Sequence, residues 1–111
     1  MRVSSRDKEF FLGKNDIFVS IQRGNGTFIL TISKALALIA GLNNFAICDY
    51  DDETKTLYIH PLATPEIGAM PIKNRQLGMC SFFRYAGISP DKGRYRAFYD
   101  PEAGDIVVKF A

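Results

Sequence analysis

The chain has 111 residues, of which 47% are hydrophobic and 23% are charged. This composition fits one globular domain and excludes a wholly disordered chain. Its 14 lysines and arginines against 12 aspartates and glutamates leave a formal net charge of +2, which excludes the strongly basic proteins that coat nucleic acid or anionic membranes through charge alone. The longest apolar stretch, near residues 36–40, is far short of the roughly 20 residues that cross a bilayer, so we expect no membrane association.

The N-terminus and the cysteines indicate the compartment. The first nine residues are charged and contain no apolar segment of the kind found in a secretory signal. Cys48 and Cys80 form neither a Cys-x-x-Cys motif nor a disulfide-rich framework. We therefore expect a cytoplasmic protein with two buried thiols, no cofactor and no metal site; a disulfide between the two cysteines is the alternative.

The first predicted element is a β-hairpin, preceded by a polar arm at residues 1–9. Residues 17–21 and 27–32 have the β-branched and aromatic composition of strands. Between them lies Asn25-Gly26, a strong signal for a two-residue hairpin turn, because both residues tolerate a positive φ angle.

A short, largely buried helix is expected directly after this hairpin. Ser33 has the side chain of an N-cap, whose hydroxyl accepts from the first free amides of a helix. Residues 34–40 are good helix formers with no charge after Lys34, and Gly41 supplies a C-terminal stop.

Two more hairpins are predicted, and the helix-then-hairpin pattern occurs twice. The second short apolar helix covers residues 80–86 and is followed by a glycine, as the first one is. The strands of the two later hairpins are predicted at 45–50 with 56–60 and at 94–100 with 105–110.

These elements predict an α+β fold, rich in β-hairpins, with two short helices. We divide the chain into a hairpin-helix-hairpin unit with a basic N-terminal arm (1–62), a Pro- and Gly-punctuated linker (63–78) and a second helix-hairpin unit packed on the first (79–111). Each unit is too small to bury its apolar face alone. Because open strand edges invite pairing, we also expect a homodimer.

The segment from the first strand to the second hairpin, residues 17–62, resembles the swapped-hairpin AbrB superfamily. The order of strand, Ser-Lys, short helix, Gly-aliphatic and hairpin is similar to that family's pattern. The matching residues are Ile32, Lys34, Leu36, Gly41 and Leu42. The resemblance implies an intertwined homodimer and a DNA-binding transcriptional regulator or antitoxin-like module. By position, it implies DNA contacts from Arg2, Arg6, Lys8, Lys14, Arg23 and Lys34.

The chain departs from the family pattern at positions that matter for DNA. Ser33 stands where the family has proline, and Ala37 stands where it has a helix arginine. The charge is nevertheless unevenly distributed, with net charges of +3 in residues 1–34, −4 in 35–70 and +3 in 71–111. Clustered basic residues of this kind supply phosphate contacts, and ordinary solvated faces are the alternative interpretation.

The remaining side chains suggest binding more than catalysis. His60 is the only histidine, and no spacing ties it to Cys48 or Cys80 as a thiolate nucleophile would require, so we expect no enzyme. The acidic tip at 49–53 lacks the spacing of a calcium loop. The alternative function is a protein-interaction module without DNA binding, for example a phage or mobile-element inhibitor, whose partner docks on the 49–53 tip or on a face formed by Arg84, Arg94 and Arg96.

Overall fold

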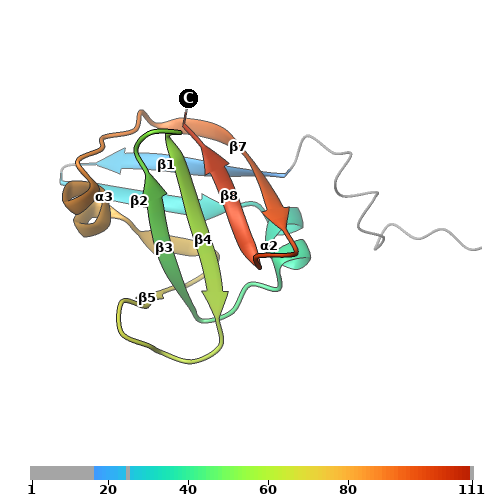
Figure 1. The fold of residues 1–111 in the computed structure, drawn as a ribbon. Helices are drawn as coiled ribbons and strands as arrows, with labels where there is room; N and C mark the ends of the chain where they lie inside the picture. The colour runs from blue at the N-terminus through green and yellow to red at the C-terminus, as the bar shows by residue number, and fades with distance from the viewer. Residues whose placement is uncertain (1–16, 25, 111) are drawn as a thin grey trace, which may run out of the picture.

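The computed structural model describes residues 17–24 and 26–110. Within them, eight antiparallel strands form one sheet that curls into a nearly closed barrel, in the order β5-β3-β4-β8-β7-β1-β2-β6 (Figure 1). The strands are β1 Phe18–Gly24, β2 Thr27–Ile32, β3 Phe45–Asp51, β4 Thr56–Leu62, β5 Met70–Pro71, β6 Gln76–Gly78, β7 Gly93–Asp100 and β8 Asp105–Lys109. The helices are α2 Lys34–Ala40 and α3 Cys80–Ala86.

The predicted α+β class, both helices and all three hairpins are confirmed. β1 pairs with β2, β3 with β4 and β7 with β8, each in antiparallel register. The two halves of the chain also pair with each other, because β8 lies beside β4 and β7 lies beside β1. The barrel is therefore built from both helix-hairpin units within one chain.

The barrel interior holds the apolar core. Along each strand, alternate side chains point inward, so that Val19 and Ile21 of β1 and Leu57 and Ile59 of β4 all belong to one buried apolar cluster. The helices lie on opposite sides of the barrel in Figure 1. α3 places the buried ring of Phe83 5.4 Å from the ring of Phe28, edge to face. None of the helices in the described part of the chain is long and apolar enough to cross a membrane.

Residues 70–78, which we name the seam hairpin, close the barrel. β5 pairs with β3, and β6 pairs with β2. Between them, the Lys73 amide donates to the Gln76 carbonyl at 3.1 Å and the Gln76 amide to the Lys73 carbonyl at 2.8 Å. Asn74 and Arg75 have φ angles of 50° and 62°, as the two central residues of a type I′ turn must.

Residues 63–78, which the sequence indicates as a linker, include this hairpin at residues 70–78. A linker would leave the outer edges of β2 and β3 unpaired, whereas β5 and β6 bridge them. The strands are two and three residues long, too short to show an alternating pattern. Arginine is also rare at positive φ, so Asn74-Arg75 gives no turn signal.

Ser33 links α2 to the first strand. Its hydroxyl oxygen accepts from the Leu36 amide at 3.4 Å, as the predicted N-cap should, and from the Phe18 amide at 3.2 Å. The Ser33 amide in turn donates to the Phe18 carbonyl at 3.0 Å. One buried side chain therefore fixes both the start of the helix and the start of β1.

Replacing this side chain tests the linkage. We expect Ser33→Ala to lower the free energy of unfolding by about 1–3 kcal/mol, because it removes a helix cap and leaves a second, partly buried amide without its acceptor. Urea unfolding followed by circular dichroism measures the change. Ser81→Ala, at an exposed serine on α3, is the matched control; equal stability of the two variants would contradict the double role.

Candidate nucleic-acid interface

The two described residues of the predicted DNA-binding set lie at opposite ends of the first hairpin. Arg23 pairs with Phe28 beside the β1–β2 turn, whereas Lys34 follows β2 and adjoins Phe18 at the start of β1. Five residues of strand, about 17 Å, separate Phe18 from Arg23. Arg2, Arg6, Lys8 and Lys14 lie outside the described residues.

Arg23 makes local contacts of its own. Its guanidinium lies 5.0 Å from the centroid of the Phe28 ring, and its Nη1 lies 3.9 Å from a carboxylate oxygen of Asp91. The Asp91 side chain is 96% exposed, so this ion pair contributes little to stability. The Asp91 carboxylate nevertheless offsets the positive charge of Arg23. Of the two residues, Lys34 is therefore the better candidate for binding an anion.

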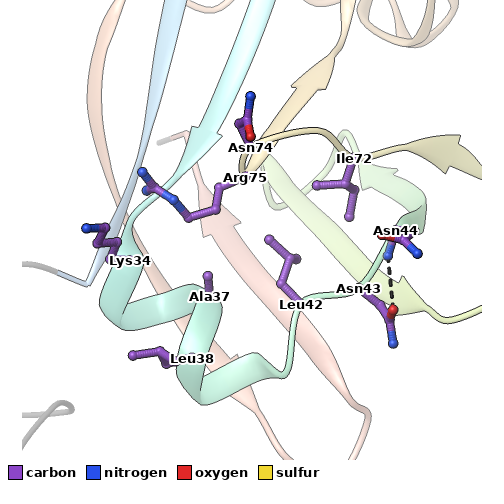
Figure 2. Close-up of a pocket in the computed structure, with 9 residues that line it drawn as sticks. All are labelled: Lys34, Ala37, Leu38, Leu42, Asn43, Asn44, Ile72, Asn74 and Arg75. Carbon is purple, nitrogen blue, oxygen red and sulfur yellow. Dashed lines mark hydrogen bonds between the residues drawn. The ribbon is translucent and has the colours of Figure 1, made fainter.

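Arg75, which the sequence analysis did not single out, lies next to Lys34. Its Nη1 donates to the Ile32 carbonyl at 2.7 Å, and its backbone carbonyl accepts from the Ile32 amide at 2.9 Å. Ile32 is two residues before Lys34, and both cationic side chains line one groove (Figure 2). The seam hairpin thus carries this arginine to the first residue of α2.

Arg94 and Arg96 lie on the other side of Phe18. Phe18 pairs with Arg96 and Ser20 pairs with Arg94 across the β1–β7 ladder. Both arginines are exposed, and the guanidinium of Arg94 stacks 4.3 Å from the centroid of the Phe18 ring. Tyr95, between them, packs inward, with its ring 4.9 Å from that of Phe110, so the alternation expected for a strand is confirmed.

These four cations, Lys34, Arg75, Arg94 and Arg96, define what we call the basic surface. Arg94 and Arg96 lie beside Phe18 across the β1–β7 ladder. Lys34 follows Ser33, which bonds to the Phe18 backbone, and Arg75 bonds to Ile32 on the next strand. Within the described residues, none of the four forms an ion pair with a carboxylate. Neighbouring like charges without counterions attract polyanions such as a nucleic-acid backbone.

A groove of about 580 Å³ adjoins the basic surface. It runs between α2 and the seam hairpin, with Lys34 and Arg75 toward one end and Asn43 and Asn44 toward the other (Figure 2). Aliphatic groups and a third amide complete the lining: Ala37, Leu38, Leu42, Ile72 and Asn74. The groove therefore combines cations, amides and apolar surface.

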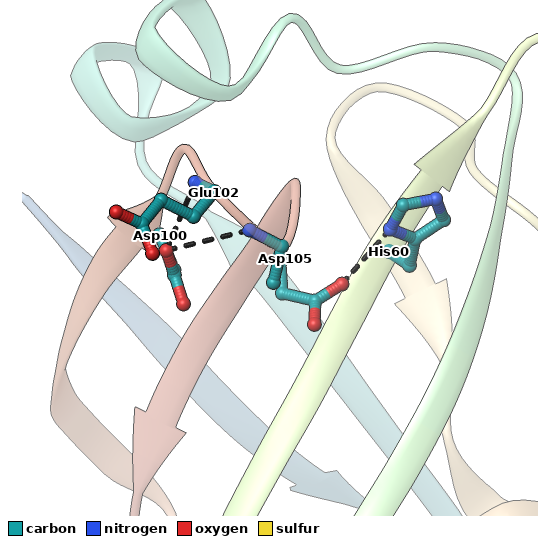
Figure 3. A network of polar contacts seen from close by, with 5 residues as sticks. His60, Asp100, Glu102 and Asp105 are labelled. Carbon is teal, nitrogen blue, oxygen red and sulfur yellow. Dashed lines mark hydrogen bonds and ion pairs between the residues drawn. The ribbon is translucent and has the colours of Figure 1, made fainter.

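Neither cysteine lies beside His60. Cys48 faces the barrel interior from β3, while His60, one step along the β3–β4 ladder, faces outward. The His60 Nδ1 instead lies 2.9 Å from a carboxylate oxygen of Asp105 (Figure 3). Cys80 sits at the opposite end of the barrel, where its thiol donates to the Gly26 carbonyl at 3.0 Å.

Two carboxylates at the hairpin tips accept hydrogen bonds from backbone amides of the turns. Asp100 Oδ1 accepts from the Glu102 amide at 3.0 Å (Figure 3), and Asp51 Oδ1 accepts from the Glu53 amide at the same distance. Among the described residues, no three histidine, cysteine or acidic side chains converge as metal ligands would. The acidic tip at 49–53 is thus accounted for in part by turn geometry.

No protein-family model matches the chain, and neither a curated protein nor a solved structure matches it. The resemblance of residues 17–62 to the AbrB superfamily stays a prediction.

The two thiols should differ in reactivity. Burial, with a smaller contribution from the Asp49 carboxylate, raises the pKa of the Cys48 thiol to about 12, and both cysteines are free. At about pH 8, Cys48 remains a protonated, unreactive thiol. In the Cys80→Ser variant, Cys48 is the remaining thiol. We expect iodoacetamide not to label it in the native protein and to label it fully in urea. Rapid labelling of the native variant would contradict the burial of Cys48.

Proposed function

We propose that this protein binds nucleic acid and that its basic surface supplies the phosphate contacts. The observation that carries the proposal is that Arg94 and Arg96 lie beside Phe18 while Lys34 and Arg75 lie at the neighbouring end of β2. Among the described residues, none of the four has a carboxylate partner. Lys34 was predicted for this role from the sequence, and in this proposal the three arginines replace Arg23 as phosphate contacts. Phosphate contacts of this kind position a protein on nucleic acid without reading its sequence.

The resemblance to the AbrB superfamily suggests which biological role the nucleic-acid binding has. The swapped-hairpin family pattern in residues 17–62 supports a transcriptional regulator or antitoxin-like module acting on DNA, as a homodimer. The basic arm residues Arg2, Arg6, Lys8 and Lys14 belong to the same proposal, because the arm joins the described chain at Ile17, directly before Phe18. In the family the hairpins of two chains interleave, whereas here both hairpins of residues 17–62 pair within one barrel.

Salt dependence tests the basic surface. We expect Arg96→Gln and Arg94→Gln each to weaken binding to DNA about uniformly across sequences and to reduce the slope of log K against log salt concentration by about 1, because each removes one phosphate contact. Fluorescence anisotropy at several salt concentrations measures both quantities.

The matched control for this test is Arg84→Gln, which removes the same charge from α3, on the side of the barrel opposite α2 (Figure 1). Its affinity and slope should equal those of the unmodified protein. Equal effects of all three substitutions would mean that only net charge matters, and the basic surface would then be rejected as the interface.

A protein-docking role is the second candidate, favoured by a recess next to α3. The recess has a volume of about 450 Å³ and combines aromatic and acidic side chains: Asp49, Tyr50, Asp52, Phe82 and Tyr85. The Tyr85 side chain is 91% exposed, and aromatic faces beside carboxylates suit a cationic partner. In this alternative the partner contacts the acidic 49–53 tip and not Arg94 and Arg96 on β7. Absence of DNA binding at low salt would favour it.

A further inference from the structure

The groove beside the basic surface has the lining that an unpaired nucleotide requires. Lys34 and Arg75 lie where a phosphate would be held, and the side chains of Asn43, Asn44 and Asn74 supply amide donors and acceptors. Ala37, Leu42 and Ile72 present aliphatic surface between them. An asparagine amide matches the paired donor and acceptor on a base edge, and apolar side chains contact the base face.

The helix beside the groove, α2, presents few side chains that could read a base pair inside a duplex. Reading the major groove requires an element that enters it with exposed side chains. α2 has seven residues, and its exposed side chains are those of Lys34 and of Leu38, which is 72% exposed. Ala35 and Leu36 anchor the helix in the barrel core. The amides that could read a base therefore lie in a groove beside the helix and not on its outer face.

Of the three amides, Asn44 has the side chain with the fewest local constraints. Its backbone carbonyl accepts from the Ile72 amide at 2.8 Å and so holds the seam hairpin to β3. Its side chain has no role in that bond. Asn43, in contrast, uses its side-chain oxygen to accept from the Asn44 amide at 3.2 Å, and Asn74 has a φ angle of 50°, which restricts substitution there.

We propose that the groove binds one unpaired nucleotide of a single strand, with its base against Leu42 and Ile72, its edge toward Asn44, and its phosphate beside Lys34 and Arg75. This inference rests on the proposed function, because the strand would continue along the basic surface. It narrows that function from nucleic acid in general to single strands. DNA and RNA share this chemistry, and the experiment has an arm for each.

The experiment compares four probes of about 12 nucleotides, a length that a single-strand site of this size accommodates. They are a mixed-sequence DNA strand, the RNA strand of the same sequence, the DNA duplex, and a DNA strand with abasic sugars that keeps the phosphates. Anisotropy titrations at one salt concentration should show the DNA or RNA strand binding at least tenfold more tightly than the duplex and the abasic strand.

Asn44→Ala then assigns the difference to the groove. We expect it to weaken single-strand binding by roughly fivefold to a hundredfold, as loss of one base contact does, and to leave abasic-strand binding unchanged. Gln76→Ala removes a similar exposed amide from the seam hairpin outside the groove and should change neither affinity.

The outcomes separate the two proposals. Equal affinity for the single strand, the duplex and the abasic strand would overturn the nucleotide groove and leave phosphate binding intact. Equal loss for Asn44→Ala and Gln76→Ala would also overturn it. Failure of all four probes to bind at low salt would overturn both the groove and the proposed function.

Discussion

The backbone pairing of the seam hairpin is the constraint on which the rest of the structure depends. Without it, β2 and β3 would be the two open edges of a curled sheet, and open edges pair with other chains. The Ile72 amide bonds to the Asn44 carbonyl on one side and the Ile32 amide bonds to the Arg75 carbonyl on the other. These two contacts bring the edges together, and the interior closes over the apolar side chains.

Closure of the barrel also builds the surface that we propose as functional. The turn that lets the chain reverse at residues 74–75 places the guanidinium of Arg75 on the Ile32 carbonyl, close to Lys34. The same turn forms one wall of the groove opposite α2. The seam hairpin therefore has two roles. It completes the sheet, and it supplies Arg75 to the proposed binding surface.

Positive and negative side chains lie on different parts of the barrel, which the total charge does not show. Cations gather beside Phe18 and along β7, whereas carboxylates gather at the tips of the β3–β4 and β7–β8 hairpins, where Asp51 and Asp100 accept hydrogen bonds from turn amides. A net charge of +2 is thus compatible with a local polyanion site, because screening limits each group's influence to about 10 Å. The acidic tips also disfavour contact of a polyanion with those ends of the barrel.

The sequence by itself determined the three hairpins, both helices and their caps, because each depends on contacts between residues close in the chain, such as the Ser33 hydroxyl with the Leu36 amide. The two-residue alternation of a strand also placed Arg94 and Arg96 on one face. Only the tertiary structure decided that residues 70–78 form a hairpin and that Arg75 joins Lys34. Those outcomes depend on pairing between segments distant in the chain, such as the bond of Arg75 to Ile32, 43 residues away. Contacts of that kind leave no local pattern in the sequence.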